Sequence, residues 1–116
     1  MIYERFARLG LAMPLVNALA RVGFSSPTII QIKTIPPQIS GRDLIGVAPT
    51  GTGKTAAFAL PILQDALASA DPLSARTCRA LVLAPTRELA AQVEACLRAL
   101  APSTAITTAL IVGGVL

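Results

Sequence analysis

Residues 48–55 read APTGTGKT and combine two glycines with a lysine and a hydroxyl side chain between an apolar run and a helix-forming run. Glycine permits backbone conformations that let amide N–H groups surround phosphate oxygens, and the positive end of the following helix dipole is aimed at the same point. Lys54 is expected to contact the β- and γ-phosphates of a nucleoside triphosphate, and the Thr55 hydroxyl to bind Mg²⁺. The predicted phosphate-binding loop consists of Ala48, Pro49, Thr50, Gly51, Thr52, Gly53, Lys54 and Thr55.

The match to a phosphate-binding loop has one departure and one alternative. Ala48 stands six residues before the lysine, where the pattern has glycine, but alanine is small enough for the same turn. The alternative is a glycine-rich connection between a strand and a helix, with Lys54 in solvent. The loop by itself indicates a nucleoside triphosphate and does not separate kinases, GTPases, transporters and motors.

The elements that must position this loop follow an α/β pattern. Short apolar runs at residues 43–48, 79–84 and 105–112 are typical of buried parallel strands. Helical segments lie between them at residues 54–68, with a kink expected at Pro61, and at residues 87–100. The alternation predicts a doubly wound α/β sheet, whose ligands bind at the carboxyl ends of the strands.

The N-terminal third predicts helices. One covers about residues 14–22 and ends at Gly23, with a stripe formed by Leu11, Leu15, Leu19 and Val22, and a second begins at residues 26–28 and is disturbed by Pro36 and Pro37. This stripe favours a docked amphipathic helix over a secretory signal. The last 18 residues are uncharged, but their proline, glycines and hydroxyl side chains favour a loop and a buried strand over a membrane span.

Composition sets wide limits. The chain has 116 residues, 53% hydrophobic and 14% charged, with a net charge of +4, which indicates one globular domain and is compatible with a polyanionic partner. Cys78 and Cys96 lie far apart and the sequence has no histidine, so a metal centre or a disulfide framework has little support. We expect both cysteines to be reduced, small apolar residues of a cytoplasmic protein.

Four ordered motifs narrow the class. GFSSPTIIQ at residues 23–31, followed by IPPQISGRD and the glycine-rich loop, resembles the Q motif and flanks of DEAD-box ATP-dependent RNA helicases. FARLGL at residues 6–11 resembles the leader of that family, APTRELAAQ at residues 84–92 its motif Ia, and VGG at residues 112–114 its GG motif, with wording nearest to bacterial members. The resemblance covers nearly the whole chain and implies a RecA-like domain.

The resemblance implies an adenine site. A side-chain amide offers one acceptor group and two donor hydrogens, so Gln31 can pair with both N6 and N7 of adenine. The resemblance also implies that Phe6 stacks near the base and that Phe24, Pro27 and Thr28 shape the pocket. Core packing is the alternative for both phenylalanines, and a solvated helix position is the alternative for Gln31.

The resemblance also implies contacts with the RNA backbone. These involve Pro85, Thr86, Arg87, Gly113 and Gly114, of which Thr86 and Arg87 would touch ribose or phosphate without reading bases. A surface charge paired with a nearby acid is the alternative for Arg87. Glu88 is expected to support the helix N-terminus.

The remaining family motifs are absent from the sequence, which ends before a DEAD stretch, a Ser-Ala-Thr motif and the second, C-terminal RecA-like domain that activity requires. We expect a truncated parallel sheet flanked by helices, with residues 1–34 as leader and residues 35–116 as an incomplete ATP-binding domain. In the family two further strands separate the runs at 43–48 and 79–84, so a central gap or association in solution is expected, whereas 79–84 and 105–112 could pair.

The resulting prediction is an N-terminal fragment of an RNA helicase that binds ATP, Mg²⁺ and RNA, with no membrane partner and doubtful activity alone. A non-catalytic nucleotide- or RNA-binding module or a pseudogene product is the alternative, and an unrelated phosphate-loop NTPase is a third.

Overall fold

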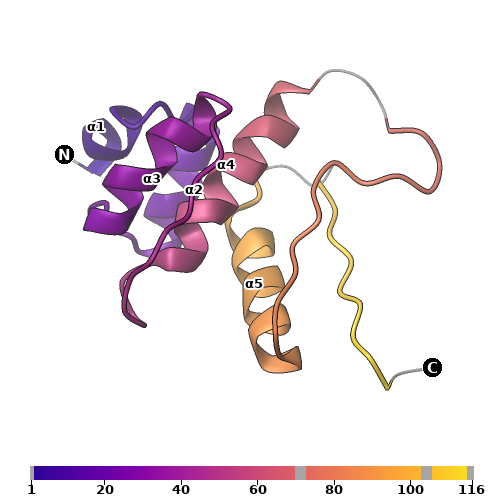
Figure 1. Cartoon of the computed structure of the whole chain (residues 1–116). Coiled ribbons are helices and arrows are strands. Elements are labelled where there is room, and N and C mark those ends of the chain that lie inside the picture. Colours follow the sequence, from indigo (N-terminus) through magenta and orange to yellow (C-terminus); the bar gives the residue numbers. More distant parts are fainter. Residues whose placement is uncertain (1, 70–72, 103–105, 115–116) are drawn as a thin grey trace.

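The structure is a computed structural model that describes residues 2–69, 73–102 and 106–114. Within these ranges the chain forms five α-helices and no β-strand (Figure 1). The helices are α1 (Ile2–Ala7), α2 (Met13–Val22), α3 (Ile29–Ile39), α4 (Lys54–Ala68) and α5 (Arg87–Leu100). The helical part of the α/β prediction is therefore confirmed, and the parallel sheet is not observed in the described residues.

Helix α2 is the amphipathic helix that the N-terminal pattern predicts. Pro14 lies in its first turn, and Gly23 ends it in a left-handed conformation with its N–H bonded to the carbonyls of Leu19 and Ala20. Leu11, Leu15 and Leu19 of the predicted stripe are buried, whereas Val22, in the last turn of α2, is 47% exposed. No helix in the described part of the chain has the length and apolarity needed to cross a membrane.

Helices α3 and α4 both contain prolines and run through them. Thr28 caps α3 by accepting from Gln31 N, while the Gln31 side chain accepts from Thr28 N, a reciprocal arrangement that fixes the helix start. Pro36 and Pro37 lie inside α3, so the expected disturbance does not end the helix before Ile39. Because α3 extends on both sides of residue 34, the two predicted units share this helix.

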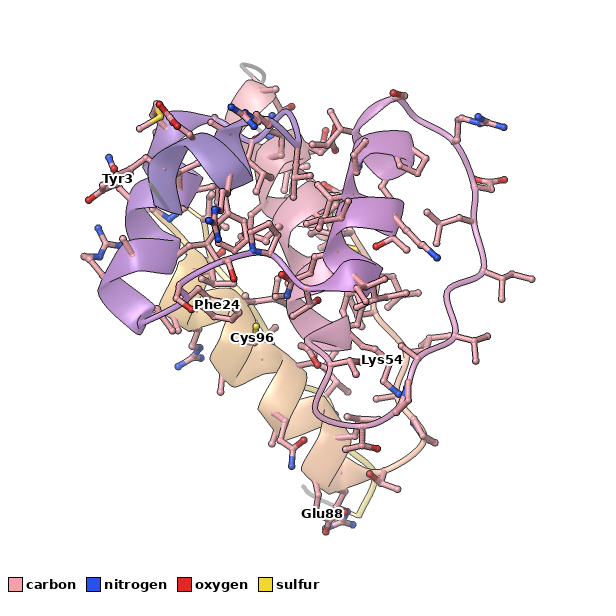
Figure 2. The ribbon with its side chains drawn as sticks, turned by 90° about the vertical axis from the view of Figure 1, so that its left-hand side faces the viewer. Tyr3, Phe24, Lys54, Glu88 and Cys96 are labelled. Atoms are coloured by element: carbon pink, nitrogen blue, oxygen red, sulfur yellow. The ribbon has the colours of Figure 1, made fainter. Side chains whose placement is uncertain are left out.

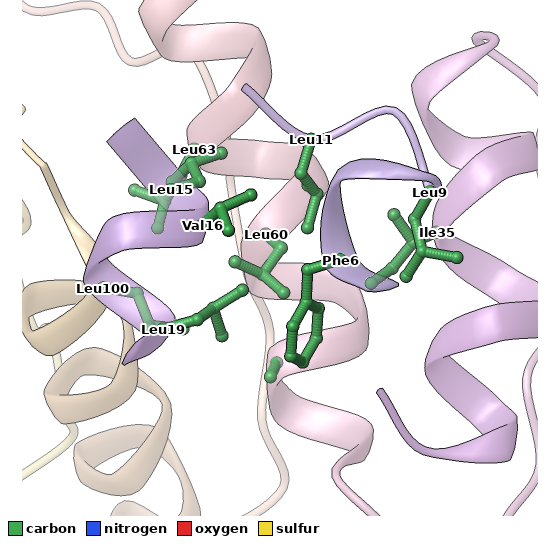
Figure 3. Packing of buried hydrophobic residues seen from close by; sticks show 11 residues of the cluster. Phe6, Leu9, Leu11, Leu15, Val16, Leu19, Ile35, Leu60, Leu63 and Leu100 are labelled. Carbon is green, nitrogen blue, oxygen red and sulfur yellow. The ribbon is translucent and has the colours of Figure 1, made fainter. Parts of the chain in front are cut away.

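The core forms around α4. Figure 3 shows Leu60 of α4 beside Phe6 of α1 and Leu19 of α2, and Leu63 beside Leu15. Ile35 of α3 and Leu100 of α5 belong to the same buried cluster. Helix α4 packs against α2, α3 and α5, so it is the central element of the helical body. Removal of this apolar surface from water supplies the main stabilising term.

The three predicted strands are extended but unpaired. Residues 43–48 and 80–84 make no hydrogen bond among the described residues, and the described part of 105–112 has no backbone bond to 79–84. The expected pairing of 79–84 with 105–112 was therefore wrong for the residues that the structure describes. Residue 105 lies outside the described residues.

The same segments are also less buried than predicted. Ile45 and Val47 are 95% and 88% exposed, and Leu81 and Leu83 are 76% and 85% exposed, because only one face of each segment rests against the helices. A Cβ added at Gly46, between the first two, would lie 3.6 Å from the Ile30 and Thr34 side chains of α3, so the backbone at this residue lies close to that helix. The alternation of a strand is present, but the second apolar cover of a parallel sheet is not seen in this structure.

The two cysteines are free thiols in different surroundings. Cys78 is exposed, whereas Cys96 packs against the core, and burial raises the pKa of its thiol. Of the two cysteines expected to be small apolar residues, only Cys96 packs in that way. Because its pKa is raised, Cys96 is expected to stay a thiol at neutral pH and to react slowly.

The position of Leu60 predicts a stability effect. Replacement of this fully buried residue, Leu60→Ala, is expected to lower the free energy of unfolding by about 2–5 kcal/mol, because it opens a cavity beside α1 and α2. Denaturant unfolding of the chain measures the change. Leu83→Ala, at an 85% exposed position, is the matched control and should change it by less than about 0.5 kcal/mol. Equal losses would show that α4 is not the centre of the core.

Candidate functional site

The glycine-rich loop leads directly into the N-terminus of α4. Gly51 and Gly53 have φ values of 85° and 83°, in the left-handed region that glycine adopts without strain. The Thr52 hydroxyl donates to Pro49 O at 2.6 Å, which closes the turn within the loop. Gly53 is the N-cap of α4 and provides no side-chain cap, so the first N–H groups of a 15-residue helix have no capping side chain and suit an anion.

The predicted loop side chains lie at the start of this helix. Lys54 is exposed and Thr55 is half-buried in the first turn of α4, and Figure 2 shows Lys54 beside the loop. Ala48, Thr52 and Gly53 are partly buried, whereas Pro49, Thr50 and Gly51 are exposed. The loop can therefore present a cation, a hydroxyl and backbone donors to one phosphate group.

Gln31 is tied to the loop through its amide. The Nε2 atom donates to Gly53 O at 3.1 Å, and Oε1 accepts from Thr28 N at 3.0 Å. The side chain is fully buried, so the solvated-helix alternative for Gln31 is not what the structure shows. This one amide joins the start of α3 to the residue that begins α4.

The other residues predicted around adenine lie close to the core. Phe6 is fully buried and meets Phe24 edge-on, with ring centroids 6.4 Å apart and planes at 82°. Phe24 is partly buried against the same cluster, and Pro27 and Thr28 are half-buried. In this structure Phe6 takes the core position that was its alternative, and Phe24 remains at the edge of the core.

A second group of predicted residues meets at the N-terminus of α5. Thr86 caps the helix, with its hydroxyl accepting from Leu89 N at 3.1 Å. The Arg87 guanidinium donates to Gly113 O, and a Cβ at Gly114 would lie 2.5 Å from Arg87 Nη2. The structure therefore brings the motif at 84–92 and the one at 112–114 together. Pro85 and Glu88 are exposed beside them.

A second contact, which the sequence interpretation missed, holds the same segment to α5. Arg98 Nε donates to Thr108 Oγ1 at 3.2 Å and its guanidinium is 3.5 Å from Glu94. Arg87 and Arg98 are eleven residues apart, which places them on one face of the helix about 16 Å apart along its axis. The five residue steps from 108 to 113 span about the same length when extended. The spacing of the two arginines in the sequence was the feature from which this second contact could have been predicted.

A groove of about 500 Å³ lies between the two groups of residues and the unpaired segments. Its walls come from α3, α4, α5 and from the two extended runs, and they include Lys54, Thr55, Leu44, Gly46, Val82, Leu83, Ala84, Leu89 and Val93. The runs at 43–48 and 79–84 both line this groove and form no hydrogen-bonded ladder with each other among the described residues. A central gap was expected within a sheet, and the described residues form no sheet.

Comparisons with known proteins give a consistent assignment. The family described as DEAD/DEAH box helicase matches residues 28–115. The chain is 50% identical over 111 residues to the ATP-dependent rRNA helicase RRP3 of Pyricularia oryzae, covering 96% of this chain and 20% of the relative. It is 47% identical over 109 residues to the probable ATP-dependent RNA helicase ddx27 of Dictyostelium discoideum, covering 94% and 14%. These two relatives are eukaryotic, so they give no support to the expected bacterial character.

A solved structure shares both fold and sequence. The crystal structure of the RNA-helicase Prp28 from Chaetomium thermophilum bound to ADP matches with a TM-score of 0.82 and 45% identity. The match covers 93% of this chain and 26% of that one. The chain therefore spans about a fifth to a quarter of the length of RRP3 and Prp28.

The contact between Gln31 and Gly53 predicts a difference between two glycines. Gly51 and Gly53 both have positive φ, but only at Gly53 would a Cβ meet another group, at 2.4 Å from Gln31 Nε2. Gly53→Ala is therefore expected to destabilise the chain by about 1–3 kcal/mol more than Gly51→Ala, because the added methyl group must displace a buried amide. Thermal unfolding of both variants measures the difference. Equal effects would mean that Gln31 does not pack against the loop.

Proposed function

The chain belongs to the DEAD/DEAH box helicase family, and we propose that it is the part of an ATP-dependent RNA helicase that binds ATP and the RNA backbone. The observation that carries the proposal is the N-terminus of α4, where left-handed glycines, Lys54 and Thr55 surround N–H groups without a capping side chain. Lys54 would contact the β- and γ-phosphates, and the Thr55 hydroxyl is the residue suited to bind Mg²⁺. Bound Mg²⁺ would neutralise phosphate charge.

Gln31 is proposed to recognise adenine. Its amide uses one hydrogen on Gly53 O and one lone pair for Thr28 N, so one hydrogen and one lone pair remain for N7 and the N6 amino group of a base. The bond to Gly53 would couple base recognition to the phosphate loop.

RNA is proposed to bind at the junction of α5 with residues 112–114. Arg87 is exposed, and its hydrogen bonds go to a neutral carbonyl and to no acid among the described contacts, which leaves its charge available for phosphate. Thr86 can donate its hydroxyl hydrogen while it caps the helix, and Pro85 adjoins it. Gly113 and Gly114 lack side chains that would obstruct a nucleic-acid backbone. These contacts carry no base specificity.

An ATP titration tests the nucleotide site. Lys54→Ala is expected to raise the Kd of the chain for Mg-ATP at least about tenfold, and Gln31→Ala to weaken binding by about 1–3 kcal/mol through loss of a bidentate contact. Lys33→Ala removes the same charge from an exposed position of α3 and serves as the control. Unchanged affinity of Lys54→Ala would remove the loop from the proposed site.

ATP hydrolysis by this chain alone is a separate prediction. Phosphoryl transfer needs a second group to hold Mg²⁺, a residue that positions water and charge stabilisation, and residues 1–116 contain no DEAD stretch that could supply the first of these. A phosphate-release assay with and without RNA should therefore show no turnover above the Lys54→Ala background. Turnover abolished by Lys54→Ala would contradict this prediction. ATP binding without turnover also fits the alternative of a non-catalytic module.

A further inference from the structure

Pro61 leaves one backbone carbonyl of α4 without its usual helical N–H donor. Proline has no N–H, so the carbonyl four residues earlier, Ala57 O, loses the donor that an α-helix normally supplies. Ala57 is 95% buried, and an unpaired carbonyl in such a place costs free energy. The turn of α4 that contains Ala57 also contains Lys54 and Thr55.

Gln38 of α3 supplies the missing donor. Its Nε2 atom donates to Ala57 O at 2.8 Å and to Thr34 O at 2.9 Å. The second bond, to the carbonyl one turn back on α3, holds the amide in the direction of α4. The half-buried side chain therefore replaces, from a neighbouring helix, the bond that Pro61 removes.

We propose that Gln38 is a positioning residue for the phosphate-binding turn. Ala57 accepts from Gln38 and donates its own N–H to Gly53 O at 3.1 Å, and Gly53 O also accepts from Gln31. Gln31 and Gln38 are seven residues apart, two turns on one face of α3, and they bind carbonyls four residues apart on α4. The two amides fix the first turn of α4 against α3 at both of its ends. The effect on nucleotide binding rests on the function proposed above.

A double-mutant cycle tests the assignment. Gln38→Leu removes the donor at similar length, and Pro61→Ala restores a helical N–H for Ala57 O. Gln38→Leu is expected to lower the Tm of this chain by about 5–10 °C, and the loss should fall by at least half in the Pro61→Ala background. Gln92→Leu, at an exposed position of α5, is the control and should show no coupling to Pro61.

The nucleotide readout separates positioning from stability. Measured well below Tm, the Kd for Mg-ATP should rise about three- to tenfold in Gln38→Leu and return to within about twofold in the double variant. Equal Tm losses in both backgrounds would overturn the replacement of the Pro61 bond. If Gln38→Leu alone fails to fold, the double variant should fold, and failure of both overturns the proposal.

The two hypotheses fail in different ways. An unchanged Kd in Gln38→Leu, beside a loss of ATP binding in Lys54→Ala, would overturn the positioning role while leaving the ATP site standing. An unchanged Kd in Lys54→Ala would contradict the ATP site, and the Tm cycle, which needs no nucleotide, would still decide whether Gln38 replaces the bond.

Discussion

Burial of the inner face of α4 is the constraint on which the rest of the structure depends. Ala56 and Ala59 keep this face narrow, so neighbouring helices can approach closely, while Leu60 and Leu63 fill the space between them. Helices α2, α3 and α5 all pack on α4, and α1 reaches it through Phe6 (Figure 3). The glycine-rich loop leads directly into the N-terminus of this same helix. The core and the loop therefore share one helix.

Apolar contacts hold α4 in place, but three glutamine amides determine its register. The Gln31 amide donates to Gly53 O at the N-cap of α4, and the Gln38 amide donates to Ala57 O one turn later. At the other end Gln64 accepts from Ala12 N at 2.9 Å and donates to Gly10 O at 2.8 Å, which fastens the connection between α1 and α2. Hydrophobic burial is non-directional, whereas these bonds each fit one alignment. The three amides thus fix how α4 is aligned with its neighbouring segments, including at the loop that precedes it.

The sequence predicts those features of this arrangement that depend on residues close together in the chain, and it does not predict contacts between distant residues. The start of α3 at Thr28 and the left-handed glycines 51 and 53 follow from side-chain chemistry within a few residues, and these predictions were confirmed. The partner of the Gln38 amide is nineteen residues away, and no local pattern identifies it. Pro61 signalled that a carbonyl would lose its donor, but only the packing of α3 on α4 shows which side chain replaces it.

For the extended segments the sequence was misleading. Their apolar composition predicted burial, but in the described structure several of their side chains are exposed. The runs at 43–48 and 79–84 are apolar on both faces, as strands covered from two sides are, yet Ile45 and Leu83 are 95% and 85% exposed. The inner faces of these runs lie against α3 and line the groove. The backbone of both runs stays extended, although it forms no hydrogen-bonded strand ladder in the part of the chain described. The loop nevertheless keeps its turn, because its hydrogen bonds go to α3 and into α4. In the described residues the glycine-rich loop is therefore tied to both helices, because Gly53 O accepts from Gln31 of α3 and from Ala57 N of α4.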